Sequence, residues 1–341
     1  MPKRLFTLVI LWLALVSFPA NARPADLSIA IGKSFPAIDT LADIEEHDAD
    51  ARACLHGLCW PRTEFSAEVE TPLQGRGDAL VRFPSPVTTG SDKNDRVAMQ
   101  WYAARDEQGH ATKAPAIIVV HESGSGMTVG QLMAKGLRNQ GFHTFMIQLP
   151  GYGLRKEGSR KTDGDLFLLR IKQSIADVRR ARDAVAALPL VDADHIAVQG
   201  TSLGGFVASD AAALDSGFDS VFLLLSGGDI TDILQHGERE SAEVRKKLEA
   251  SGFGGDQLPK LVNPIEPLRI AHRLNPQRTW LYSGIYDNVV PLKNGIALAE
   301  AAQLAPEHHI RMSANHYSGV IYIPYVLNHI REGIEASIRV D

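Results

Sequence analysis

The sequence predicts an α/β protein built on a mostly parallel sheet with helices packed on both faces. Short apolar runs, several of them rich in β-branched residues, recur from residue 96 onward, and helix-length segments separate most of them. Short strands that are apolar throughout are typical of a sheet buried under helices on each side. The runs lie at 96–103, 116–120, 143–148, 195–199, 221–225, 279–283 and 308–312.

The first 22 residues are expected to be a secretory signal peptide rather than part of the fold. Lys3 and Arg4 precede an apolar run over residues 5–16, and small residues follow at the cleavage positions. This run is too short for the roughly 20 residues that a membrane-spanning helix needs. We therefore expect a periplasmic or secreted protein with no stable membrane insertion after cleavage.

Residues 23–95 form an N-terminal extension with weak periodicity, many charges and no core of its own. One or two antiparallel edge strands are expected between about 64 and 104. In an oxidising compartment Cys54 and Cys59 could form a disulfide. A metal site that also uses His56 is disfavoured, because zinc requires four ligands and no second cysteine pair is present.

The longest predicted helix spans 165–188 and shows one apolar face at spacings of three and four residues, before Pro189 ends it. A second irregular region, 229–274, falls between two predicted strands. It contains a charged helix-like stretch at 238–250. Such an insertion usually lies above the carboxyl ends of the strands, where α/β proteins bind ligands, so 229–274 is a candidate cap.

The overall charge gives little support to a nucleic-acid partner. The chain has 35 Lys and Arg residues against 40 Asp and Glu, a formal charge of −5, and no basic block that could follow a phosphate backbone.

The strongest local signal is Gly200-Thr201-Ser202-Leu203-Gly204, which matches the G-x-S-x-G pattern. A predicted strand leads into it and a predicted helix leaves it, the setting that places a serine on a tight turn. Glycines at 200 and 204 would let the two backbones approach where a Cβ would collide. Ser202 is therefore the candidate nucleophile.

A serine nucleophile needs a base and a carboxylate that orients the base. Asp287 lies in a loop just past the strand at 279–283, and His316 follows the last strand. The order Ser202, Asp287, His316 is expected when loops at successive strand ends converge. Asp229 also follows a strand and is the alternative acid.

The oxyanion formed by serine attack needs two backbone N–H donors. Leu203, at the start of the helix after Ser202, is one candidate. Ser123 in the glycine-rich loop 121–126 is the other, with Glu122 as second choice.

The glycines of this loop also resemble a dinucleotide-binding pattern. That alternative lacks the acidic residue expected after the next strand, so no cofactor is expected. No metal site is expected either.

In these motifs the chain resembles the α/β-hydrolase superfamily, and more narrowly its dienelactone-hydrolase and acetyl-xylan-esterase-like branch of serine hydrolases. The resemblance covers residues 96–341. Its motifs are the glycine-rich loop 121–126, the turn at Ser202 (the nucleophile elbow), the Asp287 loop, His316 and the segment Leu149-Pro150-Gly151-Tyr152-Gly153. It implies an eight-stranded, mainly parallel sheet and metal-free ester hydrolysis through an acyl-enzyme. It also extends to prolyl-oligopeptidase-like peptidases, but the roughly 73 residues between the expected signal and residue 96 are too few for their large N-terminal propeller, so a peptidase of that architecture is not expected.

The expected function is an exported serine hydrolase that cleaves a carboxylic ester, with a small-molecule or carbohydrate-linked substrate. The same three residues would also serve an amidase or a thioesterase. A non-catalytic binding module that kept the fold is the alternative from another class.

Overall fold

The computed structural model describes residues 26–73, 75–157 and 164–340, without the side chain of Val340. The expected signal peptide, 1–22, lies outside the described residues. A ten-stranded sheet has the order β1-β2-β3-β4-β6-β5-β7-β8-β9-β10. Its strands are β1 (Ser34–Ile38), β2 (Glu64–Glu70), β3 (Ala79–Pro84), β4 (Arg96–Tyr102), β5 (Ala114–Val120), β6 (His143–Gln148), β7 (Val191–Thr201), β8 (Val221–Leu224), β9 (Thr279–Gly284) and β10 (His309–Met312).

The sheet is parallel from β6 to β10 in its spatial order and antiparallel from β1 to β4, with β4 antiparallel to β6. The predicted mostly parallel architecture is confirmed. The implied count of eight strands is wrong: residues 96–341 contribute seven strands, β4 to β10, and the N-terminal extension adds β1, β2 and β3 to the same sheet. Strand β1 was not predicted, because it lies at the outer edge and its side chains are exposed or half-buried without an apolar alternation.

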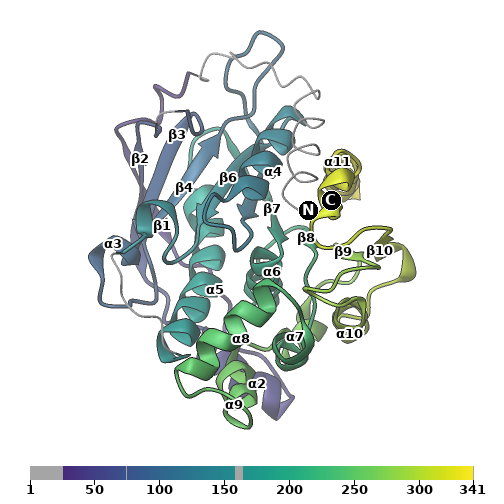
Figure 1. The fold of residues 1–341 in the computed structure, drawn as a ribbon. Helices are drawn as coiled ribbons and strands as arrows, with labels where there is room; N and C mark the ends of the chain where they lie inside the picture. The colour runs from purple at the N-terminus through teal and green to yellow at the C-terminus, as the bar shows by residue number, and fades with distance from the viewer. Residues whose placement is uncertain (1–25, 74, 158–163, 341) are drawn as a thin grey trace.

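Helices cover both faces of the sheet (Figure 1). The side chains of β5 show why, because they alternate between two apolar cores, one on each face. Ile118 and Val120 belong to a core shared with α5 (Gly164–Ala186) and α6 (Leu203–Ala213). The intervening Ile117 and Val119 belong to a second core shared with α4 (Thr128–Asn139) and α11 (Ile323–Val340). Because successive side chains of a strand point to opposite faces, an unbroken apolar run requires helices on both.

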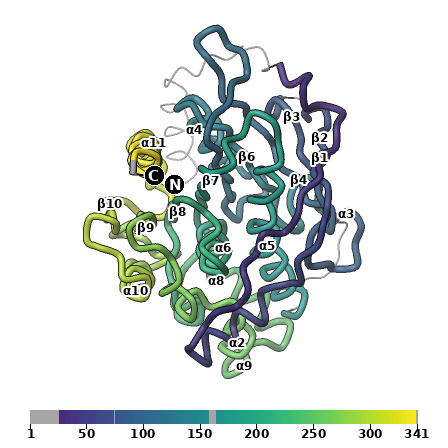
Figure 2. The backbone as a smooth tube through the Cα atoms, turned by 180° about the vertical axis from the view of Figure 1, so that it is seen from behind, coloured from purple at the N-terminus to yellow at the C-terminus, as the bar shows by residue number. Residues whose placement is uncertain are grey.

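The candidate cap between β8 and β9 consists of short helices. Figures 1 and 2 show α9 at one end of the molecule, near α2 of the extension. The cap elements are α7 (Ile230–His236), α8 (Glu240–Ala250), α9 (Gln257–Val262), η2 (Asn263–Ile265), η3 (Pro267–Arg269) and η4 (Ala271–Arg273). The remaining helices are α2 (Ala49–Leu58), α3 (Asp92–Asp95), η1 (Gly153–Arg155), α10 (Leu292–Ala301), η5 (Pro306–His308) and η6 (Ser318–Tyr322).

The expected disulfide is absent, because Cys54 and Cys59 are both free thiols. Cys54 lies within α2 and Cys59 caps its C-terminus. Five positions along a helix separate two Cα atoms by about 8 Å and turn the side chains well apart, beyond the bridging limit of about 7 Å. Burial raises the pKa of Cys54 to about 12 and that of Cys59 to about 11.

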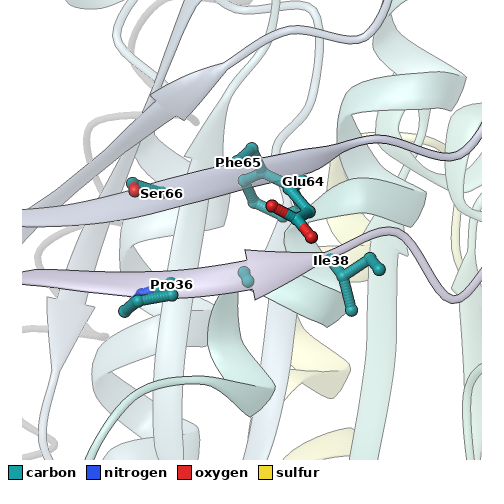
Figure 3. A pocket seen from close by; sticks show the side chains of 6 residues that line it. Pro36, Ile38, Glu64, Phe65 and Ser66 are labelled. Atoms are coloured by element: carbon teal, nitrogen blue, oxygen red, sulfur yellow. The ribbon is translucent and has the colours of Figure 1, made fainter.

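A shallow pocket lies along the paired edge strands β1 and β2 and is lined by Pro36, Ile38, Glu64, Phe65 and Ser66 (Figure 3). Strand β7, which leads to the G-x-S-x-G turn, is six positions further along the sheet. At about 4.8 Å per strand this is about 29 Å, so the edge pocket is remote from the candidate nucleophile. In the described part of the chain, no helix has the length and hydrophobicity needed to cross a membrane.

Candidate active site

Ser202 occupies the turn between the end of β7 and the start of α6. Its backbone has φ 53° and ψ −119°, a region that a non-glycine residue rarely adopts. A Cβ on Gly200 would lie 2.1 Å from the Gly204 carbonyl oxygen, and one on Gly204 would lie 2.2 Å from that of Val120. The predicted close approach of strand and helix backbones is confirmed at Gly200 for β7 and α6, whereas Gly204 lets α6 approach the end of β5.

The structure brings Ser202, His316 and Asp287 together in one chain of hydrogen bonds. The Nδ1 atom of His316 lies 2.7 Å from Asp287 Oδ2, and its Nε2 atom lies 3.0 Å from Ser202 Oγ. A carboxylate only accepts, so Nδ1 carries the proton and donates it to Asp287. The free lone pair on Nε2 then accepts the Ser202 hydroxyl proton.

The loop after β9 fixes the carboxylate of Asp287, whose side chain is almost fully buried. Its Oδ1 atom accepts from the backbone N–H groups of Val289 (2.8 Å) and Val290 (3.0 Å), which leaves Oδ2 for the histidine. The alternative acid, Asp229, has a different role: its side chain accepts from the Asp232 N–H and caps α7. The structure therefore gives His316 its carboxylate from Asp287.

The Ser123 peptide is oriented by a buried histidine that the sequence did not single out. His121 Nε2 accepts from the Leu149 N–H (3.1 Å), so its Nδ1 carries the proton and donates to the Glu122 carbonyl (2.6 Å). Burial lowers the pKa of His121 to about 4, which keeps the ring neutral. Across a trans peptide the carbonyl and the next N–H point in opposite directions, so the Ser123 N–H points away from His121.

Two further side chains shape this loop. The Tyr152 hydroxyl donates to the Ser123 carbonyl (2.9 Å), and its ring packs edge-on against His121. The carboxylate of Glu122 accepts from the N–H groups of Val129 and Gly130 and so caps α4. The signal that could have identified Tyr152 was its position in the motif after the next strand. Nothing in the sequence indicates the cap made by Glu122, because it depends on the loop conformation.

Leu203 is the first residue of α6, where backbone N–H groups have no acceptor within the helix. The next hydrogen bonds there run from Gly205 and Phe206 to the Ser202 carbonyl. The Leu203 N–H thus remains available beside the serine. Across the described ranges, no three His, Cys, Asp or Glu side chains come close enough to hold a metal ion.

Several solved structures share this fold at low sequence identity. An acetyl xylan esterase from Paenibacillus sp. R4 superposes with a TM-score of 0.59 at 18% identity, covering 87% of this chain and 98% of that one. Acetyl xylan esterase 1 from Thermoanaerobacterium sp. JW/SL YS485 gives 0.55 at 16% identity, covering 85% and 95%. A puromycin-hydrolyzing peptidase from Mycobacterium tuberculosis gives 0.53 at 15%, covering 79% and 46%. These likenesses establish the α/β-hydrolase fold.

Comparison with curated proteins gives no match. The sequence matches the profile of the prolyl oligopeptidase family over residues 134–322, more than half of the chain. This stretch contains Ser202, Asp287 and His316 and begins after the loop that carries Ser123. The chain therefore belongs to the prolyl oligopeptidase family and is a serine hydrolase.

Proposed function

We propose that this enzyme hydrolyses carboxylic esters through an acyl-enzyme on Ser202. The observation that carries the proposal is the continuous hydrogen-bonded chain from Ser202 Oγ through His316 to Asp287. As Oγ attacks the ester carbonyl carbon, His316 Nε2 takes its proton and later gives it to the leaving alkoxide. Asp287 holds the ring in the required tautomer and stabilises the imidazolium that forms.

The N–H groups of Leu203 and Ser123 are the proposed oxyanion donors. The Leu203 N–H is supported by its place at the N-terminal end of α6, where backbone N–H groups have no acceptor within the helix. The Ser123 N–H is supported by the orientation that His121 gives to the peptide. Water then attacks the acyl-enzyme with His316 as the base, which releases the acid and restores Ser202. Every proton in this cycle moves through His316, so no cofactor is required.

The choice of an ester substrate rests on resemblance and on fold. Two of the structurally similar proteins are acetyl xylan esterases, which supports testing both small acetyl esters and acetylated sugars. Export to the periplasm or the outside of the cell is proposed from the basic start and apolar run of residues 1–22. Amino-terminal sequencing of the secreted protein would test the cleavage after Ala22.

The decisive experiment is intact mass after treatment with a fluorophosphonate. We expect a single adduct on the wild type and none on a folded Ser202→Ala variant, because the probe reacts only with an activated serine. Esters of graded acyl length, an anilide and a thioester are then compared by kcat/KM. If the folded wild type is not labelled and also fails to cleave 4-nitrophenyl acetate, the proposed hydrolase activity is rejected in favour of the non-catalytic binding module.

A further inference from the structure

The connection between α7 and α8 of the cap, taken with the first two residues of α8 as 237–241, packs directly on the loop that follows Asp287. The Glu238 N–H donates to the Asn288 carbonyl (2.7 Å), and the Ser241 hydroxyl donates to the Val289 carbonyl (2.9 Å). Both acceptors come immediately after the carboxylate that orients the histidine. The cap connection is therefore fixed relative to the three reacting side chains.

The same connection also contacts the residue that follows His316. The Tyr317 hydroxyl donates to the Glu240 carboxylate, and the Arg239 guanidinium carbon lies 4.6 Å from the centre of the Tyr317 ring. That ring stands edge-on to the imidazole, 5.9 Å away. Taken together, these distances limit the separation of the guanidinium from the imidazole to about 10 Å, the length of a small substrate.

The backbone of Arg239 is strained. It has φ 53° and ψ −113°, nearly the same conformation as Ser202, in a region that suits glycine. A glycine there would avoid the cost. Strain of this kind persists where the surrounding contacts hold the residue in place, as the hydrogen bonds on both sides of it do here.

The charge of Arg239 is not neutralised by a neighbouring side chain. Among the described residues no carboxylate forms an ion pair with its guanidinium, whose polar partner is the Tyr317 phenol oxygen, and the adjacent Glu240 carboxylate is engaged with the same hydroxyl. The residue is exposed, and a guanidinium has five N–H donors, so the donors that the Tyr317 oxygen does not use face solvent. A planar fork of donors matches a carboxylate.

We propose that Arg239 binds a carboxylate of the substrate, so that the enzyme prefers esters carrying a negative charge a few bonds from the scissile carbonyl. This inference rests on the proposed ester hydrolysis at Ser202. It assigns the cap a part in substrate selection: Tyr317 links the histidine loop to the arginine, and Arg239 recognises the acidic group.

A pair of esters of equal length tests the preference. Mono-4-nitrophenyl glutarate carries a terminal carboxylate where 4-nitrophenyl pentanoate carries a methyl group. We expect the wild type to favour the glutarate in kcat/KM, and the Arg239→Gly variant to lose that preference by about tenfold to hundredfold, mostly through KM. Raising the ionic strength should weaken the wild-type preference in the same direction.

Two controls separate recognition from structural damage. Lys246→Gln removes an exposed positive charge from α8, the helix that Arg239 precedes as N-cap residue, and should keep the wild-type ratio. Arg239→Gly should melt at the same or a higher temperature than the wild type, because glycine relieves the strained φ. An unchanged glutarate-to-pentanoate ratio in a folded Arg239→Gly variant would overturn the proposal.

Failure of the proposed function gives a different result. If neither ester is cleaved and the fluorophosphonate leaves no adduct, ester hydrolysis fails, and Arg239 is tested by binding alone. Glutarate should then raise the melting temperature of the wild type and leave that of Arg239→Gly unchanged. Equal responses of the two proteins would refute carboxylate binding by Arg239.

Discussion

Replacing Asp287 by Asn is expected to disable the proton transfer while leaving the loop intact. The Oδ1 atom of Asp287 accepts from two backbone N–H groups, at 2.8 and 3.0 Å, and only an oxygen can take that position. The amide oxygen of the introduced asparagine would therefore occupy it, and the amide nitrogen would face His316 Nδ1. Because that nitrogen only donates, His316 would have to accept with Nδ1 and carry its proton on Nε2.

The magnitude follows from the tautomer. With a proton on Nε2, the ring cannot accept the hydroxyl proton of Ser202, which lies 3.0 Å away. In serine proteases the same exchange lowers kcat by about 10⁴, equivalent to about 5.4 kcal/mol of transition-state stabilisation. The two backbone hydrogen bonds survive, so the melting temperature should change little.

The assay is kcat for 4-nitrophenyl acetate across pH, with thermal melting followed by circular dichroism. Asp229→Asn is the matched control, because Asn retains both the helix cap and a tolerance for the positive φ at that position. That variant should remain within a few-fold of wild type. If Asp287→Asn kept more than a tenth of the wild-type kcat, the assignment of the acid would be refuted.

Three further predictions concern stability and the cysteines. Gly204→Ala should destabilise the fold by more than about 3 kcal/mol, because the added Cβ would meet a backbone oxygen. Gly57→Ala in α2 should instead stabilise the fold by about 0.5–1 kcal/mol, because the added Cβ would meet only the end of the Lys172 side chain, at 3.5 Å. Urea unfolding measures both changes. Burial lowers the pKa of His143 to about 4, and its Nδ1 accepts from two buried N–H groups. The unfolded chain takes up this proton at a higher pH, near 6.5, than the folded protein does. The neutral ring therefore contributes about 3 kcal/mol to the free energy of unfolding, which is fully present above pH 6.5 and is lost as the pH falls toward 4. Thermal melts at pH 7 and pH 4.5 should differ less in His143→Gln than in the wild type, and parallel slopes would contradict this. Ellman's reagent should find no fast-reacting thiol in the native protein and two thiols after unfolding, from Cys54 and Cys59. If no thiol reacted after unfolding, the two cysteines would be joined in a disulfide and this prediction would be wrong.

Much of the parallel sheet could be predicted because the signal is local. An apolar run such as 116–120 is buried on both faces, and its composition alone indicates a strand under two layers of helices. The expected helix over 165–188 is α5, Gly164–Ala186. Strand β1 gave no such signal, because an edge strand with exposed side chains needs no apolar pattern.

The candidate active site also has a part that could be predicted from the sequence and a part that could not. The elbow at Ser202 could be predicted because G-x-S-x-G describes a steric requirement of one turn, with glycines at the points of backbone contact. The partner residues were candidates only by their order along the chain. Their approach to 2.7 and 3.0 Å is a property of the folded loops.

The sequence by itself determined the α/β class and the nucleophile turn, because each depends on residues close together in the chain, and it offered candidates for the acid and base through their order after successive strands. Only the tertiary structure decided that Asp287 rather than Asp229 meets His316, that Cys54 and Cys59 stay apart on one helix, and that Arg239 lies against the ring after the histidine. The first and the last are contacts between segments distant in sequence, and the second follows from α2, a helix that was not predicted from the sequence. Their geometry is set by how the whole sheet and its helices pack, which no short pattern encodes.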